Sequence, residues 1–198
     1  MVEHYYSEKQ SSALKKKFLD IKVVRDGVSL SLKLESAAGL FSKDRLDNAT
    51  KLLIENAIIH DDWRVLDLGC GYGAVGICLK RFFPGLKIVM SDVNERAVML
   101  ARKNAEKLDI EVVQSDVFEN ISGSFNAIIL NPPYAAGREL CFRMVRESSL
   151  HLEKGGLLEV VARHQKGGKT LKAEMERVFG NVKDVKKSGG FRVYVSER

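Results

Sequence analysis

The sequence is poor in cysteine and proline, and none of its apolar runs is long. Its three cysteines, Cys70, Cys78 and Cys141, are odd in number and form no CxxC pair, which argues against a disulfide framework and a zinc site. No apolar stretch approaches the roughly 18 residues of a membrane-spanning helix, and the N-terminal residues MVEHYYSEKQ lack the apolar core of a signal peptide. These absences predict a protein of the reducing cytoplasm.

Metal ligands, repeats and polar linkers are also scarce. The four histidines are scattered, and no two of them have ligand spacing, so we predict no metal site. No internal repeat or low-complexity segment divides the 198 residues. With 45% hydrophobic and 29% charged residues, the chain is too apolar for a disordered protein and has the composition of one globular domain.

Charge is distributed unevenly along the chain. The 32 lysines and arginines exceed the 26 acidic residues by six. From Arg163 to Arg198 there are ten basic and four acidic residues, so this C-terminal stretch holds the whole excess. Two interpretations stay open. The lysines form an ordinary solvated surface, or they face the phosphates of a nucleic acid, whose binding depends on Lys and Arg.

The N-terminal part alternates apolar and polar residues in two runs. The first run includes residues 21–23 and the second covers 28–34, with Asp26-Gly27 between them. This arrangement predicts a β-hairpin. Farther along, apolar residues from about 45 to 58 recur at helical spacing and predict an amphipathic helix.

Beyond Trp63, strand patterns alternate with helical patterns. We expect strands at 64–68, 86–91, 110–114, 125–131, 156–162, 182–186 and 191–196, and helices at 75–83, 94–108, 137–152 and 170–179. Alternating strands and helices predict an α/β fold with a mostly parallel sheet covered on both faces. Only a turn at 188–190 separates the last two strands, so the last strand must be antiparallel.

A glycine-rich loop, VLDLGCGYGAVG, follows the strand at 64–68. Gly69, Gly71 and Gly73 would let a ligand approach the backbone closely, and the next helix would present unpaired N–H groups. Gly71, Gly73 and Gly76 also match the GxGxxG fingerprint of dinucleotide-binding proteins. The loop alone therefore predicts a nucleotide-like cofactor without identifying it.

Acidic residues at the ends of two strands separate the candidate cofactors. Asp67 precedes the loop, where a carboxylate would repel a pyrophosphate and attract an ammonium group. S-adenosylmethionine carries an ammonium and a sulfonium and has no phosphate. Asp92 ends the next strand, 19 residues after Gly73, and suits the ribose hydroxyls of either cofactor. Asp67 therefore favours S-adenosylmethionine over a dinucleotide.

A third acid, Asp116, follows the strand at 110–114. It is placed to accept a hydrogen bond from an adenine amino group, with Val93 and Val117 packing on the ring. Taken alone, Asp116 would be interpreted as a turn or helix-cap aspartate. As the third acid in a series at strand ends, it is interpreted as part of the cofactor site.

The tetrapeptide Asn131-Pro132-Pro133-Tyr134 follows the strand at 125–131. Its prolines fix φ and lack N–H donors, so the groups left are acceptors, namely the carbonyls of Asn131 and Pro132. Acceptors suit a target –NH2 group, and Tyr134 offers a flat face on which a planar group can stack. The alternative is a rigid turn without chemistry, because Asn-Pro favours turns.

The segments DLGCGYG, SDVN, SDVF and NPPY, in this order, resemble class I S-adenosylmethionine-dependent methyltransferases over about residues 63 to 198. The resemblance implies a Rossmann-like seven-stranded sheet, here preceded by a hairpin and a helix. We expect residues 1–60 to form an extension that packs on a methyltransferase domain at 61–198. The resemblance implies cofactor contacts from Asp67, Gly69, Cys70, Gly71, Gly73, Asp92, Val93, Asn94, Asp116, Val117 and Asn131.

In related families, (Asn/Asp)-Pro-Pro-(Tyr/Phe) marks methylation of adenine N6, guanine N2, cytosine N4 or a glutamine amide. The N-terminal part resembles the methyltransferase small-domain family, in particular small-subunit ribosomal RNA guanine-N2 methyltransferases, through Gly39, Phe41, Ser42 and Asp44. Larger bacterial members carry a second, inactive domain where this chain has only about 60 residues. RNA docking by such a domain is therefore not expected here.

The resemblance favours guanine N2 of ribosomal RNA as the target. We expect RNA contacts from Phe41, Ser42, Arg45, Lys186 and Lys187. A protein glutamine-amide methyltransferase shares NPPY and stays an alternative, as do other RNA or DNA amino methyltransferases. A non-catalytic RNA-binding module would not need Asp67, Asp92 and Asn131 together. An NAD-dependent dehydrogenase would explain neither Asp67 nor NPPY.

Overall fold

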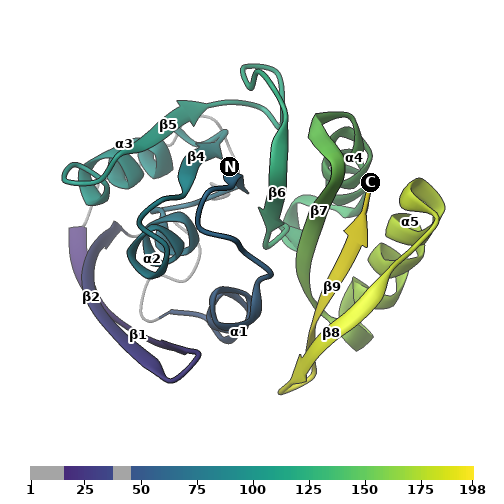
Figure 1. Ribbon diagram of the computed structural model, residues 1–198, viewed down its shortest axis with the longest axis horizontal. Helices are drawn as coiled ribbons and strands as arrows, with labels where there is room; N and C mark the ends of the chain where they lie inside the picture. The colour runs from purple at the N-terminus through teal and green to yellow at the C-terminus, as the bar shows by residue number, and fades with distance from the viewer. Residues whose placement is uncertain (1–15, 38–45) are drawn as a thin grey trace, which may run out of the picture.

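The computed structural model describes residues 16–37 and 46–198, which form a seven-stranded sheet with a separate hairpin (Figure 1). The order across the sheet is β5-β4-β3-β6-β7-β9-β8. The pairs among β3 to β7 are parallel, whereas β9 runs antiparallel to both of its neighbours. The strands are β3 (Arg64–Leu68), β4 (Lys87–Asp92), β5 (Ile110–Gln114), β6 (Phe125–Leu130), β7 (Leu152–Arg163), β8 (Lys183–Ser188) and β9 (Phe191–Glu197).

This topology confirms the predicted fold class and the antiparallel last strand. One strand is longer than predicted, because β7 begins at Leu152 and continues through two glycines. There, Gly155 N–H donates to the carbonyl of Arg198, and Arg198 N–H donates to the carbonyl of Gly156. Arg198 thus pairs with residues at the junction between the predicted helix at 137–152 and the predicted strand at 156–162.

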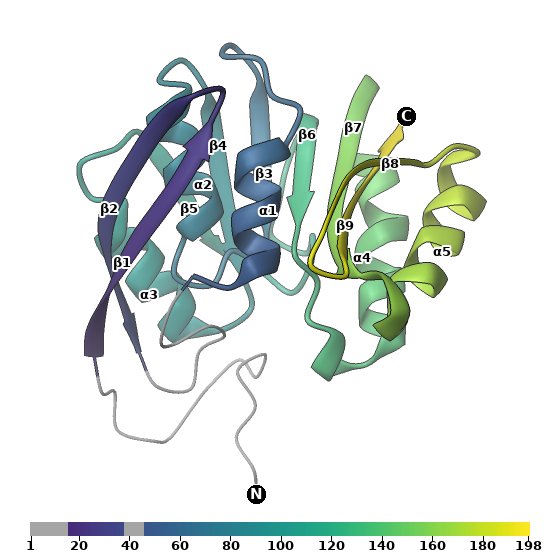
Figure 2. The same cartoon turned by 90° about the horizontal axis from the view of Figure 1, so that it is seen from below.

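The helices cover the two faces of the sheet in separate groups (Figures 1 and 2). On one face lie α1 (Asn48–Asn56), α2 (Ala74–Phe82) and α3 (Glu95–Asn104), together with the hairpin. On the other face lie α4 (Arg138–His151) and α5 (Lys169–Phe179). Alternate residues of each strand serve the two layers, so Val65 packs with the first group and Leu66 with the second.

The hairpin consists of β1 (Lys16–Arg25) and β2 (Val28–Ala37), as predicted. Asp26 and Gly27 both have positive φ, 49° and 80°, which is the backbone of a tight two-residue hairpin turn. The inward side chains Leu19, Ile21 and Val23 are buried in the same cluster as α1, α2 and α3. The hairpin therefore extends the hydrophobic core instead of standing apart from it.

Helix α1 begins at Asn48, later than the expected 45, because Asp47 caps it: Asp47 Oδ1 accepts hydrogen bonds from the backbone N–H groups of Ala49 at 2.9 Å and Thr50 at 3.0 Å. The helix ends before Ala57, whose backbone is extended. This cap matters for the site, because it fixes the first turn of α1, where Thr50 contacts Asn131 just after β6.

A buried carboxylate holds α1 and the hairpin against the sheet. Glu159 on β7 is fully buried, and both of its oxygens accept from Ile58 N–H at 2.9 Å. Burial raises the pKa of Glu159 to about 8, although the nearby Arg25 guanidinium opposes this. Arg25 itself donates to the backbone carbonyls of Ile54 and Ala57. Among the described helices, none has the length and apolar character needed to cross a bilayer.

Candidate active site

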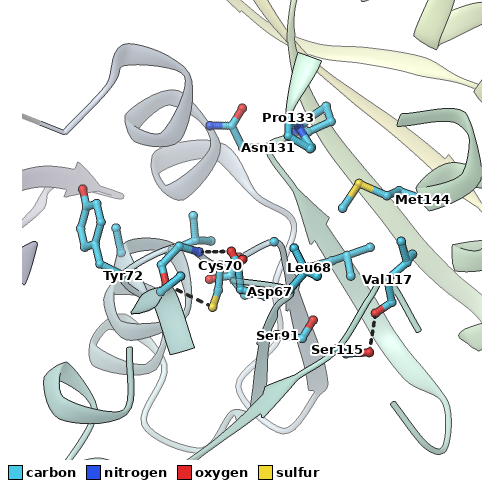
Figure 3. A pocket seen from close by; sticks show the side chains of 18 of the residues that line it. Asp67, Leu68, Cys70, Tyr72, Ser91, Ser115, Val117, Asn131, Pro133 and Met144 are labelled. Atoms are coloured by element: carbon cyan, nitrogen blue, oxygen red, sulfur yellow. Dashed lines mark hydrogen bonds between the residues drawn. The ribbon is translucent and has the colours of Figure 1, made fainter. Parts of the chain in front are cut away.

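A cavity opens at the carboxyl ends of β3, β4 and β6 (Figure 3). Its empty space of about 1030 Å³ includes solvent at the open mouth. This edge of a parallel sheet is where ligands bind in doubly wound folds. The cavity is lined by Asp47, Thr50, Asp67, Leu68, Gly69, Cys70, Gly71, Tyr72, Ala74, Val75, Ser91, Asp92, Val93, Ala97, Ser115, Asp116, Val117, Asn131, Pro132, Pro133, Leu140 and Met144. Most of the predicted cofactor residues thus surround one space.

The glycine loop wraps around the end of β4. The N–H groups of Gly69 and Cys70 both donate to the carbonyl of Ser91 at 2.8 Å, and Gly71 N–H donates to Asp92 Oδ2 at 2.9 Å. Gly69 and Gly71 have φ of 73° and 58°, which a side chain would strain. The loop therefore presents bare backbone to the cavity.

Two predicted cofactor residues lie behind the cavity wall instead of on it. Gly73 precedes α2 with φ of 91°, and a Cβ there would approach Ile77 and Met90 at 3.1 to 3.2 Å. Asn94 caps α3 by accepting hydrogen bonds from the N–H groups of Arg96 and Ala97. Both residues therefore have a structural role in the backbone: Gly73 leads into α2, and Asn94 caps α3.

Two carboxyl groups line the cavity beside the loop, one buried (Asp67) and one half-buried (Asp92). Asp67 is 3% exposed, and its Oδ2 accepts from Gly76 N–H at 2.9 Å at the start of α2. Burial raises the pKa of Asp67 to about 7, with a further contribution from Asp92. Burial also raises the pKa of Asp92, against the hydrogen bonds that it accepts from Asn94 and Gly71. A cation in the cavity would favour the ionised form of both groups.

A further polar atom in this part of the cavity has no protein partner. The Ser91 hydroxyl is buried and, among the described residues, makes no hydrogen bond. A buried polar group without a partner is costly, so such atoms in cavities commonly bind a ligand or water. Ser91, the carboxylates and the bare loop form a set of groups that fits a polar ligand with a positive charge.

Asp116, expected to accept from adenine, is already paired with an arginine of α4. Both of its oxygens lie 3.1 Å from Arg143 Nη1, while Arg143 Nε donates to Glu147 at 2.7 Å. The Asp116 side chain is 45% exposed and still lines the cavity. A carboxylate has about four acceptor positions, so this ion pair leaves acceptor capacity for a ligand amine.

Val117 beside Asp116 has an unusual backbone. Its φ is 51°, a conformation that β-branched residues rarely adopt. Ser115 holds the turn in place, because its hydroxyl donates to the carbonyl of Val117 and accepts from Asn120 N–H, each at 3.0 Å. The strained turn places Val117 in the lining of the cavity, to which Leu140 and Met144 of α4 also belong.

Asn131, Pro132 and Pro133 form another part of the wall, after β6 (Figure 3). The amide nitrogen of Asn131 donates to Thr50 Oγ1 at 3.0 Å. The carbonyl of Pro132 accepts from Tyr134 N–H at 2.9 Å, and Pro133 has φ of −79° and ψ of 75°, which together make a tight turn. The acceptors at this turn are Asn131 Oδ1 and the Pro132 carbonyl oxygen, which keeps a second lone pair.

Tyr134 lies beside the cavity and does not line it. Its ring packs against Gly167, where a Cβ would come within 3.1 Å of the ring. The Tyr134 hydroxyl is buried without a hydrogen-bond partner in the described part of the chain, and burial raises its pKa well above the usual range. The predicted stacking platform is therefore packed partly against the loop after β7.

The predicted RNA-contacting residues fall into two groups. Phe41, Ser42 and Arg45 lie outside the described residues. Lys186 and Lys187 are exposed on β8, three strands from β6, which is about 14 Å at roughly 4.8 Å per strand. Asp184 neutralises part of this basic region, since it contacts Lys172 at 2.6 Å and Lys187 at 3.8 Å.

Sequence reasoning missed several residues that line the cavity: Asp47, Thr50, Tyr72, Ser91, Ser115, Leu140 and Met144. Asp47 carried a recognisable signal, an aspartate just before a helical pattern, but that signal predicts only a cap. Leu140 and Met144 are four residues apart on one helix face, a spacing that predicts core packing. Within residues 16–37 and 46–198, no group of His, Cys, Asp and Glu could hold a metal ion.

Comparisons with known proteins place the chain in a family. The model of the methyltransferase small domain family matches residues 31–195. The chain is 33% identical to the uncharacterised protein YbxB of Bacillus subtilis over the full length of both. It is 35% identical to the ribosomal RNA small subunit methyltransferase C of Haemophilus influenzae, with 83% of this chain and 51% of that protein covered. The chain thus spans about half the length of this methyltransferase.

A solved structure shares the fold. The 16S rRNA N2 methyltransferase RsmC of T. thermophilus, determined with AdoMet and guanosine, superposes with a TM-score of 0.79 at 23% identity. The match covers 94% of this chain and 51% of the other. The chain therefore belongs to the methyltransferase small domain family, and the prediction of an S-adenosylmethionine-dependent methyltransferase is confirmed at the level of that family.

Proposed function

We propose that the chain transfers a methyl group from S-adenosylmethionine to N2 of a guanine in ribosomal RNA. The observation that carries the proposal is that one cavity is lined by acidic side chains on one side and by carbonyl acceptors on another. Asp67 and Asp92 form an acidic wall suited to a cation, and the Asn131 and Pro132 carbonyls form an acceptor wall suited to an –NH2 group.

The cofactor fits the acidic side of the cavity. Asp67 would hold its ammonium group, Asp92 its ribose hydroxyls, and the bare backbone at Gly69 and Gly71 would lie against it. The unpartnered Ser91 hydroxyl would gain a hydrogen bond. When bound, S-adenosylmethionine supplies a methyl group on a positively charged sulfur, which is a good leaving group.

On the acceptor side, the chain positions the amine. Asn131 Oδ1 and the Pro132 carbonyl would each accept one hydrogen of the target –NH2, so that its lone pair faces the cofactor side of the cavity. This arrangement is catalysis by orientation and electrostatics. No strong base is required before attack, because the nitrogen becomes acidic as it gains the methyl group and its proton can pass to water.

The choice of RNA is supported by two observations. The related H. influenzae and T. thermophilus proteins are named as ribosomal RNA methyltransferases, and the C-terminal stretch from Arg163 carries the whole net positive charge of the chain. We propose that Lys186 and Lys187 contact the RNA backbone at a distance from the target base. Residues 1–60 would act as an extension of the catalytic domain at 61–198.

The proposal is tested by offering labelled S-adenosylmethionine with naked 16S rRNA, small ribosomal subunits, transfer RNA and cell protein. The RNA is digested and the modified nucleoside is identified by mass. N2-methylguanosine supports the proposal. Label found in protein as methylglutamine would contradict it and assign the same acceptor wall to an amide substrate.

A further inference from the structure

Helix α1 brings two polar side chains from the N-terminal extension into the cavity. Asp47 and Thr50 line it together with Asn131, although 81 residues separate Thr50 from Asn131 in sequence. Thr50 is 7% exposed. Thr50 is therefore a buried threonine beside the acceptor wall, and it is a candidate for a role in the reaction.

The hydrogen bonds among these three residues have only one consistent direction. The Asp47 carboxylate accepts and cannot donate, so the single proton of the Thr50 hydroxyl points to Asp47 Oδ2. The hydroxyl then offers a lone pair to its other neighbour. Asn131 must therefore turn its –NH2 toward Thr50, which is the contact of 3.0 Å.

This direction leaves the carbonyl oxygen of Asn131 able to accept a hydrogen bond from a ligand. Among the described residues, none donates a hydrogen bond to Asn131 Oδ1. Rotation of the amide by half a turn would present –NH2 instead, and two donors would then face each other at the target amine. The acceptor character of this wall depends on which way the amide is held.

We propose that Asp47 and Thr50 are positioning residues that fix the Asn131 amide with its carbonyl oxygen toward the target amine. The inference rests on the proposed function, because it presumes that Asn131 holds that amine. It gives the N-terminal extension a part in the active site. The helix cap that starts α1 and the orientation of Asn131 then depend on one carboxylate, since Asp47 Oδ1 caps while Oδ2 accepts from Thr50.

The first test compares Thr50→Val, Thr50→Ser and Asn48→Ala. Valine keeps the shape and removes the hydroxyl, serine keeps the hydroxyl, and Asn48 is an exposed control in the same helical turn. We expect Thr50→Val to lower kcat by about tenfold, the effect of one well-oriented hydrogen bond, with cofactor Kd within twofold. Thr50→Ser and Asn48→Ala should stay near wild type. Turnover of Thr50→Val within twofold of wild type would overturn the inference.

The second test reverses the chain of hydrogen bonds. Asn at position 47 still caps a helix well, but its amide can donate to Thr50 Oγ1. The Thr50 proton would then be free to point to Asn131, whose amide would turn its –NH2 to the substrate. Asp47→Asn should therefore lose at least as much turnover as Thr50→Val while its melting temperature stays close to that of wild type. Unchanged turnover would contradict the proposed direction.

A measurement without substrate separates this inference from the proposed function. The side-chain amide signals of Asn131 in a 15N spectrum can be assigned by their loss in Asn131→Asp. They should shift and exchange faster with solvent in Thr50→Val and stay unchanged in Asn48→Ala. If they do not respond to Thr50→Val, the inference fails whatever the substrate is. If they respond and no RNA is methylated, only the proposed function fails.

Discussion

The two sides of the cavity are built in different ways. The side with Asp67, Asp92 and Asp116 consists of short segments that each follow a neighbouring strand of one sheet. The side with Asn131 joins the end of β6 to the first turn of α1, which precedes every strand of the seven-stranded sheet in sequence. The acids of the first side lie at the ends of β3, β4 and β5, whereas the position of Asn131 on the second side also depends on how α1 is seated. Cofactor binding and target positioning should therefore be separable by mutation.

Asn131→Ala should give the largest separation. Loss of an oriented acceptor at the reacting group should lower turnover by about 100- to 1000-fold, while cofactor affinity measured by calorimetry stays within a few-fold. The matched control is Asn126→Ala, which removes an amide at the opposite end of β6, where it accepts from Arg64 N–H. Near-normal turnover of Asn131→Ala would contradict the proposal that Asn131 accepts a hydrogen bond from the target amine.

Asp67→Asn should affect the other side first. The substitution keeps the shape and removes the charge, so we expect cofactor Kd to rise by about 10- to 100-fold, as for a hydrogen bond to a charged group. Asp62→Asn, at an exposed position before β3, is the control. Calorimetry with S-adenosylmethionine measures both variants. Equal affinities in the two would show that the Asp67 carboxylate does not hold the cofactor.

The charges of Lys186 and Lys187 should affect RNA binding and leave cofactor binding unchanged. Reversal of Lys186 and Lys187 to glutamate should weaken RNA binding by about tenfold or more and reduce its salt dependence, with cofactor affinity unchanged. Reversal of Lys107, an exposed lysine on the far side of the sheet next to β5, is the control. Filter binding at several salt concentrations measures the effect. An unchanged affinity and salt slope would make this region an ordinary solvated surface.

The cofactor side should also respond to pH. The pKa of Asp67 in the free protein is raised to about 7, and the ionised carboxylate is the form that attracts an ammonium group. Affinity should therefore rise by about tenfold between pH 6 and pH 7.5 and then level off. Calorimetry across this range measures it, with Asp67→Asn as the variant without the dependence. A flat profile in wild type would contradict a titrating Asp67.

Glu159 should affect the stability of the fold through the seating of α1, and neither cofactor binding nor RNA binding directly. Its folded-state pKa is raised to about 8, against about 4.5 in the unfolded chain. Between these values only the folded state keeps the proton, so stability is full below about pH 4.5 and falls by up to about 1.4 kcal/mol per pH unit as pH rises. Denaturant unfolding should show this slope in wild type and a flatter one in Glu159→Gln. Equal slopes would contradict the raised pKa.

The difference between the two sides also explains what could be predicted from the sequence. The β-hairpin, the seven strands and the antiparallel end follow from alternation and turn residues, which are local signals. Asp67, Asp92 and Asp116 could be expected to meet because parallel strands bring their carboxyl ends to one edge. The structure brings all three to one cavity.

Contacts between distant elements could not be predicted. Nothing near Asn131 in sequence indicates Thr50, because their contact depends on how α1 packs against β7 and β9. The pairing of Asp116 with Arg143 and the packing of Tyr134 against Gly167 are likewise set by α4 and by the loop after β7. In each case the residue type indicated a place in the site, but the sequence did not indicate which residue it contacts.

The most direct test of the account is the methylated product formed by wild type and Asn131→Ala side by side. Small ribosomal subunits and naked 16S rRNA lacking the modification are incubated with labelled S-adenosylmethionine, and the digested nucleosides are identified by mass. We expect N2-methylguanosine with wild type and almost none with Asn131→Ala at equal cofactor occupancy. N2-methylguanosine formed equally by both proteins, or label in protein alone, would contradict it.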